Sequence, residues 1–152
     1  ARTRGTITHL VYLAAAMFGA EDDYPALMAE YQTPLSANLT TRDGDYVTVQ
    51  PHTATAAFYS DCPDAVARTA VARLRPTNIA CITPTGPPAE PWRETPSLFI
   101  VCTRDKAMPP EAQAILARKA DKTIHLDTDH SPFYSANEAL CAALTEELPI
   151  AV

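Results

Sequence analysis

Glycine and positive charge are both scarce in this sequence of 152 residues. It has 4 glycines against 14 prolines, and 12 Lys and Arg residues against 18 Asp and Glu, for a formal net charge of -6. Nucleic-acid binding requires a basic surface that neutralises phosphates, so this balance argues against DNA or RNA as a partner. The prolines gather between Pro76 and Pro110, where they predict irregular connections between apolar anchors rather than disorder.

Long apolar runs and targeting signals are absent as well. The longest apolar run, from Leu10 to Phe18, is too short to cross a bilayer, and the first five residues lack the apolar core of a signal peptide. We therefore expect a cytoplasmic protein with no membrane partner. Because the first residue is not Met, we also expect that the natural N-terminus is missing or was processed.

No metal-binding motif is visible. The 4 cysteines form no CxxC pair, which argues against a zinc site and a redox dithiol, and the acidic residues match no 12-residue calcium loop. We expect no metal, no organic cofactor and no disulfide. The cysteines are predicted to be free, small, buried hydrophobic residues. They are Cys62, Cys81, Cys102 and Cys141.

Three segments have the composition of strands in a parallel sheet. Residues 8–16 and 97–103 are nearly continuous apolar runs, the pattern of strands that are buried on both faces. A helix is the alternative for residues 8–16, but the short length and the β-branched and aromatic start favour a strand. Residues 122–127 are shorter and alternate in polarity, which predicts a strand nearer to the edge of the sheet.

Two segments with helical spacing follow the later strands. Residues 110–120 begin with proline, have Glu111 in the first turn and place apolar side chains on one face. Residues 136–148 repeat this pattern. From residue 97 onwards the chain alternates strand, helix, strand, helix, which predicts an α/β fold with helices packed on a parallel sheet.

The stretch between the first two strands breaks this alternation. It contains predicted helices at residues 24–31 and 64–74, a turn at Asp43-Gly44 and a short strand at residues 46–49. Such an insertion between two sheet strands is typical of a lid. We therefore divide the chain into a core strand at residues 1–19, a cap at residues 20–94 and the C-terminal part of the core at residues 95–152.

Asp105 and His130 are the candidate catalytic residues, because each closely follows a predicted strand. In open parallel sheets the ligand site lies beyond the carboxyl ends of the strands. An acid after one strand and a histidine after the next have the order of these groups in a hydrolase triad, where the carboxylate orients the imidazole that deprotonates a hydroxyl. Taken singly, Asp105 would be an ordinary turn residue and His130 a solvated loop residue. Their shared strand context favours catalysis.

The remaining histidines and the single tryptophan have plainer interpretations. His9 precedes a buried strand and His125 lies within one, so we interpret both as structural residues. His52 is expected at the surface. Trp92, which is flanked by prolines, is interpreted as a packing anchor.

The segments around the two candidate residues resemble the α/β-hydrolase superfamily. TRDKAMPPEAQ at residues 103–113 and LDTDHSP at residues 126–132 are similar to the acid turn and histidine loop of plant methylesterases, hydroxynitrile lyases and their bacterial esterase relatives. Residues 10–18 resemble the strand after the nucleophile-bearing helix, and residues 60–63 and 74–76 resemble the cap. The resemblance covers essentially the whole chain and implies the second half of the α/β-hydrolase sheet with an inserted cap.

This resemblance also implies roles for individual residues. Asp105 would be the triad acid, because its spacing to Pro110 and Gln113 fits the family, and His130 would be the general base. The residues facing the substrate would be Phe18, Met108 and Ser131. Ser131 stands where the cyanohydrin-cleaving members have a lysine, so ester hydrolysis is favoured over the lyase reaction.

The nucleophile of this family has no counterpart in the sequence. No serine here has glycines two positions to either side, so the G-x-S-x-G elbow is missing. The early strands of the sheet are missing too, which would leave residues 8–16 with an unpaired edge. We hypothesise an N-terminal segment, either cleaved and still bound or supplied as a separate chain, that donates the nucleophile and the oxyanion hole.

The sequence thus predicts a serine hydrolase that acts on a small, largely apolar carboxylic ester through an acyl-enzyme. Two functions of a different class stay open. One is a receptor or carrier that binds a small molecule and does not use the triad. The second is a lyase, cyclase or acyl-transfer reaction on the same fold.

Overall fold

A three-stranded parallel sheet is the centre of the fold. The computed structural model describes residues 7–81 and 90–148. The sheet has the order β1-β5-β6, with β1 at Leu10–Leu13, β5 at Ser97–Cys102 and β6 at Lys122–Leu126. All six residues of β5 are buried between its two neighbours. The strands predicted at residues 97–103 and 122–127 are confirmed to within one residue, and β6 forms an edge of the described sheet.

The first strand is shorter than the prediction of residues 8–16. Ala14 has a φ of 42°, which lies in the left-handed region that L side chains rarely adopt, so the extended conformation ends at Leu13. Beyond this turn Met17 is fully buried and Phe18 packs against the same core cluster. The second half of the apolar run therefore contributes side chains to the core from a loop rather than from a strand.

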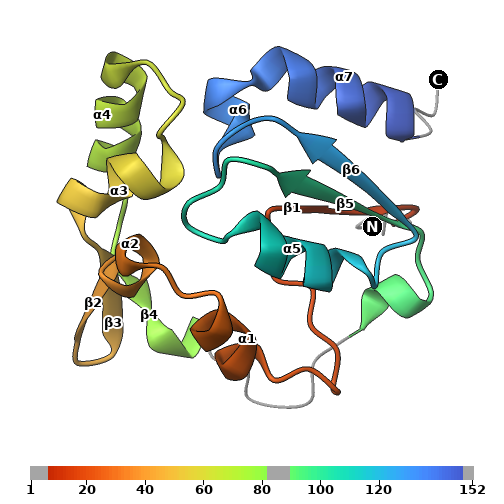
Figure 1. Ribbon diagram of the computed structural model, residues 1–152, viewed down its shortest axis with the longest axis horizontal. Coiled ribbons are helices and arrows are strands. Elements are labelled where there is room, and N and C mark those ends of the chain that lie inside the picture. Colours follow the sequence, from red (N-terminus) through yellow and green to blue (C-terminus); the bar gives the residue numbers. More distant parts are fainter. Residues whose placement is uncertain (1–6, 82–89, 149–152) are drawn as a thin grey trace, which may run out of the picture.

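Helices cover both faces of the sheet (Figure 1). On one face α5, Pro110–Ala117, packs Leu116 against Phe99. On the opposite face α7, Asn137–Glu147, packs Leu140 against Ile100, and the short helix α6, Pro132–Ser135, precedes it. Successive side chains of β5 point to opposite faces, and both faces are covered, so the strand is a continuous apolar run. Burial of a side chain such as Leu116 contributes about 1.5–3 kcal/mol.

The chain between β1 and β5 contains several short helices and a second, antiparallel sheet. Its hairpin turns at Gly44, whose φ of 55° favours glycine. The predicted helices at residues 24–31 and 64–74 and the strand at residues 46–49 are confirmed to within a residue. The elements are α1 (Tyr24–Glu30), α2 (Pro34–Ala37), β2 (Thr40–Asp43), β3 (Tyr46–Val49), α3 (Pro51–Phe58), α4 (Asp64–Arg73), β4 (Thr77–Asn78), η1 (Ile79–Cys81) and η2 (Pro91–Arg93).

The sequence patterns do not predict the other elements of this stretch, namely α2, β2, α3, β4, η1 and η2. The buried positions of α3 are Thr53, Ala54 and Ala57, which are too small or polar to produce an apolar stripe in the sequence. The antiparallel sheet β2-β3-β4 stands apart from the parallel sheet. In Figure 1 the arrowheads of β5 and β6 point towards α3 and α4, so this part of the chain lies beside the carboxyl ends of the strands.

The prediction of buried cysteines is wrong for three of the four. All are free, but Cys81 and Cys141 are exposed, Cys62 is half-buried and Cys102 alone is buried. Cys141 lies on the outer side of α7 and Cys81 in the short turn η1, so neither faces the core. Trp92 is confirmed as a packing anchor in the core, with its ring 6.3 Å from that of Tyr12.

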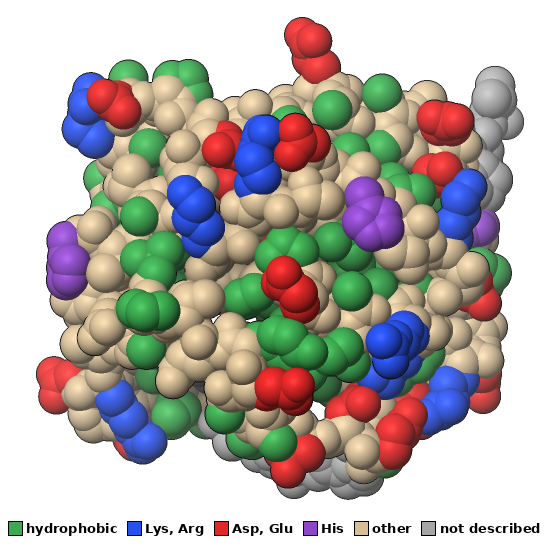
Figure 2. Space-filling view, in the orientation of Figure 1, with side chains coloured by type: hydrophobic (Ala, Val, Ile, Leu, Met, Phe, Trp, Pro, Cys, Tyr) green, Lys and Arg blue, Asp and Glu red, His purple; other side chains and the backbone are tan. Residues whose placement is uncertain are grey.

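On the face of the molecule drawn in Figure 2, charge is scattered rather than concentrated. Figure 2 shows basic and acidic side chains interspersed over one face, with apolar side chains between them. His52 is exposed, as expected, and His125 is exposed as well although it lies within β6. No helix within residues 7–81 and 90–148 combines the length and the apolar character needed to cross a bilayer. Part of the proline-rich stretch, residues 82–89, lies outside the described residues.

Candidate active site

The structure brings Asp105 and His130 into direct contact. Cys102 at the end of β5 pairs with Leu126 at the end of β6, so the turns that follow the two strands leave the sheet side by side. The Nδ1 atom of His130 lies 2.7 Å from Oδ2 of Asp105. The Asp105 side chain is fully buried, whereas the His130 side chain keeps 29% of its surface exposed. This is the arrangement of a buried orienting carboxylate and an accessible imidazole.

Backbone hydrogen bonds continue the pairing of the strands into these two turns. The Thr103 N–H donates to the Leu126 carbonyl at 2.9 Å, and the Arg104 N–H donates to the Thr128 carbonyl at 3.0 Å. The acid turn and the histidine loop are therefore joined by their backbones before their side chains meet. This extension of the ladder fixes the distance across which Asp105 reaches His130.

Four donors hold the Asp105 carboxylate. Oδ1 accepts hydrogen bonds from the backbone N–H groups of Ala107 at 2.8 Å and Met108 at 2.9 Å. Oδ2 accepts from Nε2 of Gln113 at 2.8 Å and faces His130. Hydrogen bonds to an ionised carboxylate are stronger than those between neutral groups, and four of them leave this one little freedom to turn. These hydrogen bonds therefore fix the orientation of the Asp105 carboxylate towards the imidazole.

Gln113 connects this carboxylate to the rest of the fold. Its side chain is buried on α5, where Oε1 accepts from the backbone N–H of Cys102 at 3.0 Å and Nε2 also donates to the Met108 carbonyl at 2.7 Å. The side-chain amide of Gln113 thus links helix α5 by hydrogen bonds to the end of β5 and to the acid turn. The sequence gives a weak signal for this role, a polar residue on the apolar face of the predicted helix between Ala112 and Leu116.

The far side of the imidazole faces the inserted part of the chain. The Phe58 ring, at the end of α3, lies 5.0 Å from the His130 ring at an interplanar angle of 35°. With Nδ1 directed at Asp105, Nε2 is left without a hydrogen-bond partner among the described residues. No pattern in the sequence points to Phe58, because it comes from a helix with no clear apolar stripe.

The residues predicted to face the substrate lie in different surroundings. Phe18 and Met108 both pack against the core cluster that contains Met17 and Phe99, and the Phe18 ring lies 4.2 Å from that of Tyr24. Ser131, directly after His130, is 2% exposed. Contact of these residues with a substrate stays a prediction.

The two thiols nearest to the site are poor nucleophiles. Burial, with the Asp129 and Asp61 charges adding to it, raises the pKa of Cys62 to about 11. Burial likewise raises the pKa of Cys102 to about 12. The thiolate is the reactive form, so only a small fraction of either group is reactive at neutral pH. Within residues 7–81 and 90–148, no serine hydroxyl and no thiol is hydrogen-bonded to His130.

The sequence matches the model of the Alpha/beta hydrolase family over residues 2–143. Together with the parallel sheet and the acid and histidine turns beyond its strands, this match shows that the chain belongs to the α/β-hydrolase family. The predicted family and fold class are thereby confirmed. Among curated proteins, none matches the sequence.

Solved structures with a similar fold include two esterases and a synthase. Polyneuridine aldehyde esterase is 15% identical with a TM-score of 0.76, and the alignment covers 91% of this chain and 61% of that chain. A methylesterase from Arabidopsis is 22% identical with a TM-score of 0.69, covering 91% and 58%. A tomato methylketone synthase variant complexed with beta-ketoheptanoate is 18% identical with a TM-score of 0.71, covering 91% and 60%. The chain thus spans about three fifths of the length of these structures.

Proposed function

We propose that this chain is the C-terminal part of a carboxylic ester hydrolase in which His130 is the general base and Asp105 the acid that orients it. The observation that carries the proposal is the 2.7 Å contact between Nδ1 of His130 and a buried carboxylate oxygen that is itself fixed by other donors. Such a contact sets the tautomer that carries the proton on Nδ1 and leaves Nε2 as the acceptor.

In the proposed reaction Nε2 of His130 removes the proton from a serine hydroxyl supplied from outside the described residues, and the serine oxygen attacks the ester carbonyl carbon. Asp105 stays ionised and stabilises the imidazolium. Collapse of the tetrahedral intermediate breaks the carbon–oxygen bond of the ester, and the departing alcohol takes the proton from Nε2. Water, deprotonated by the same nitrogen, then releases the carboxylic acid and restores the serine.

The proposed substrate is an ester of a small, largely apolar molecule. An open hollow of about 390 Å³ lies beside Asp105, where Pro34 and Leu35 of α2 face Pro109. Its lining is predominantly apolar, and its size falls at the lower end of the range of ligand pockets. In this proposal residues 20–94 act as the cap, and Phe18, Met108 and Ser131 contribute to the substrate pocket.

The proposed partner of this chain is an N-terminal segment that carries the nucleophile and the oxyanion hole. Two observations support it. The similar solved structures are longer than this chain, which aligns to 58–61% of them. Within the described residues β1 pairs with β5 on one side only. That segment would belong to the same natural protein or to a second chain.

A fluorophosphonate probe tests the proposal on the natural full-length protein, because it reacts only with an activated serine. We expect covalent labelling that stops in His130→Ala and continues in His52→Ala, a matched histidine variant at an exposed position. Peptide mapping should place the adduct on a serine outside this sequence. An adduct on Ser36, Ser60, Ser97, Ser131 or Ser135 would contradict the external nucleophile, and no adduct at all would favour the receptor or carrier.

A non-hydrolytic reaction is the second candidate, and the similarity to the methylketone synthase favours it over a receptor or carrier. Labelling by the probe does not separate it from hydrolysis, because both reactions would use the same triad. Product analysis does. Release of the free acid and alcohol from an ester supports hydrolysis, whereas an intact ester together with a lyase or transfer product supports the non-hydrolytic reaction.

A further inference from the structure

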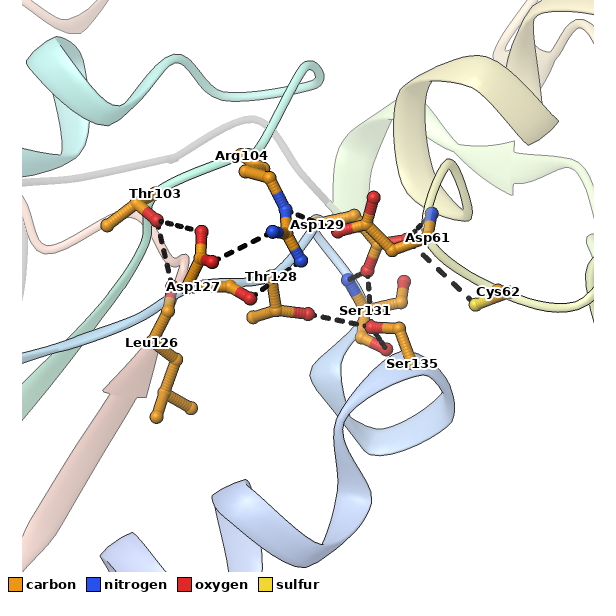
Figure 3. A network of polar contacts seen from close by, with 10 residues as sticks. All are labelled: Asp61, Cys62, Thr103, Arg104, Leu126, Asp127, Thr128, Asp129, Ser131 and Ser135. Carbon is orange, nitrogen blue, oxygen red and sulfur yellow. Dashed lines mark hydrogen bonds and ion pairs between the residues drawn. The ribbon is translucent and has the colours of Figure 1, made fainter.

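A second buried carboxylate, that of Asp129, stands directly before His130 in the chain. The residue is completely buried. Figure 3 shows it at the centre of a polar network that joins the turn after β5, the loop after β6, helix α6 and the segment between α3 and α4. A buried carboxylate is costly unless donors surround it, so the donors that face Asp129 indicate what the fold holds in place there.

Three strong donors from three parts of the chain face Asp129. Oδ1 accepts from the backbone N–H of Ser131 at 3.0 Å and from Oγ of Ser135 at 2.7 Å. Oδ2 accepts from the backbone N–H of Asp61 at 2.8 Å, with Sγ of Cys62 at 3.9 Å. The bonds to Ser131 and Ser135 close a tight turn around His130. The bond to Asp61 spans 68 positions of the sequence and reaches the inserted part of the chain.

Among the described residues, no positively charged side chain forms an ion pair with Asp129. The nearby cation, Arg104, instead pairs with Oδ2 of Asp61 at 3.0 Å and with Oδ2 of Asp127 at 2.8 Å, and half of its side chain is exposed. Exposed pairs of this kind contribute little to stability. The oriented N–H and O–H groups therefore stabilise the Asp129 charge, and they require the loop to keep one conformation.

We propose that Asp129 is a positioning residue that holds the backbone of His130 in its catalytic place and ties that loop to the Asp61 turn. The inference rests on the proposed function, since it assigns Asp129 to the histidine of that site. Asp105 fixes the imidazole through Nδ1, and Asp129 fixes the backbone that carries it. The same carboxylate anchors the inserted part of the chain above the histidine, so the loop and that part are set in place together.

Turnover and nuclear magnetic resonance of the full-length protein test this inference. In Asp129→Ala we expect kcat for p-nitrophenyl butyrate to fall about 10- to 100-fold, because small misplacements of a catalytic group have effects of this size. KM should stay within about threefold, because the substrate pocket is retained. The downfield resonance of the His130 Nδ1 proton, assigned through its loss in His130→Ala, should broaden or disappear.

Asp127→Asn is the matched control, because it removes the same charge two positions away from a side chain that is 77% exposed. It should keep both the turnover and the Nδ1 resonance. Asp129→Asn should lie between the alanine variant and the wild type, since an amide retains one acceptor oxygen and leaves one donor facing another N–H. A purely structural role would lower the melting temperature while the folded fraction kept its kcat and its resonance.

Wild-type kcat and an unchanged Nδ1 resonance in folded Asp129→Ala would overturn the inference. If Asp129→Ala does not fold, Asp129→Asn and Ser135→Ala test the inference instead, since each removes part of the same hydrogen-bond set. Unchanged turnover and an unchanged Nδ1 resonance in both variants would also overturn the inference. Failure of the proposed function has a different signature: the wild type would hydrolyse no ester, while the Nδ1 resonance would still respond to Asp129→Ala.

Discussion

Three aspartates close to the ends of β5 and β6 differ sharply in their surroundings. Asp105 is fully buried and directs one oxygen at the imidazole, while Asp129 is buried and bonds to the backbone and hydroxyl groups around it. Asp127 is largely exposed and pairs with Arg104. Donors and burial distinguish these carboxylates, and residue type does not. Substitutions at the three positions should therefore have three different effects.

The role of Asp105 is tested by Asp105→Asn. The new amide nitrogen at the Oδ2 position would face Nε2 of Gln113, so one donor loses its acceptor and the free energy of unfolding should drop by about 1–3 kcal/mol. The imidazole loses the group that fixes its tautomer, and we expect kcat to fall by about three to four orders of magnitude. Steady-state kinetics and thermal unfolding of the full-length protein measure both. Full activity in this variant would remove Asp105 from the mechanism.

The raised pKa of Cys62 predicts a steep pH dependence of its labelling. Burial and the neighbouring Asp129 and Asp61 charges favour the neutral thiol, so its thiolate fraction grows about tenfold per pH unit until the pH nears 11. Iodoacetamide labelling followed by peptide mass spectrometry should show a rate about 100-fold higher at pH 10 than at pH 8. The exposed Cys81 and Cys141 serve as internal references at pH 8, where they should react first.

The same thiol reports on Asp129. Because that carboxylate helps to raise the pKa of Cys62, Asp129→Asn should lower this pKa and speed labelling at pH 8. Asp127 is not among the charges that raise the pKa, so Asp127→Asn should leave the rate unchanged. Equal rates in the wild type and Asp129→Asn would contradict the electrostatic coupling between Asp129 and the thiol.

At the scale of elements, helix α5 both covers the sheet and positions the acid. Its apolar residues, such as Leu116, pack against β5, and Gln113 reaches from the same face to the strand end and to Asp105. A helix that packs on the sheet thus also supplies a hydrogen bond to the Asp105 carboxylate. Damage to this contact should affect stability and catalysis together.

Gln113→Leu tests this double role. Leucine keeps much of the volume but leaves the Cys102 N–H and the Met108 carbonyl without their partners and removes one donor from Asp105. Each buried unsatisfied group costs about 1–3 kcal/mol, so urea unfolding should show a loss of about 2–5 kcal/mol. Turnover should fall too. Gln32→Leu, at an exposed position after α1, is the control and should change neither. A stable, fully active Gln113→Leu variant would show that the contact is dispensable.

At the scale of the whole molecule, β1 has no strand on its outer side among the described residues, and we propose that the N-terminal segment pairs there. The backbone N–H of Leu10 donates to the carbonyl of Pro96, just before β5, and that of Ala14 donates to the carbonyl of Ile100 within β5. Amides alternate in direction along a strand, so those of Val11 and Leu13 point away from β5. Val11 is also 39% exposed. An edge whose amides have no partner among the described residues, with an exposed apolar side chain beside them, is a surface that another strand can cover.

Hydrogen–deuterium exchange tests this arrangement. In the full-length protein we expect the Val11 and Leu13 amides to be protected like that of Leu10, because a preceding strand would accept their hydrogen bonds. In residues 1–152 alone, the Val11 and Leu13 amides should exchange much faster than that of Leu10. Equal protection of all three in the isolated chain, as a single folded monomer of 16.4 kDa, would reject the missing partner.

Much of the fold could be predicted from the sequence, because strands and helices that pack on each other need apolar residues at fixed spacings. The continuous run at β5 and the helical spacing of α5 and α7 identify these elements to within a few residues. The strand predicted at residues 8–16 is too long, because an apolar run does not show that Ala14 turns the chain. Helix α3 gives no signal in the sequence because small residues face the core there.

The sequence by itself determined that an acid and a histidine follow adjacent strands, and hence that Asp105 and His130 can meet. Only the tertiary structure decided which donors hold them, since Gln113, Phe58 and the Asp61 amide reach the site from other elements. Hydropathy patterns record which face of an element is buried and carry no information on which distant polar group will lie opposite. Those contacts follow from packing, which brings together, for example, Asp61 and Asp129, 68 positions apart in the chain.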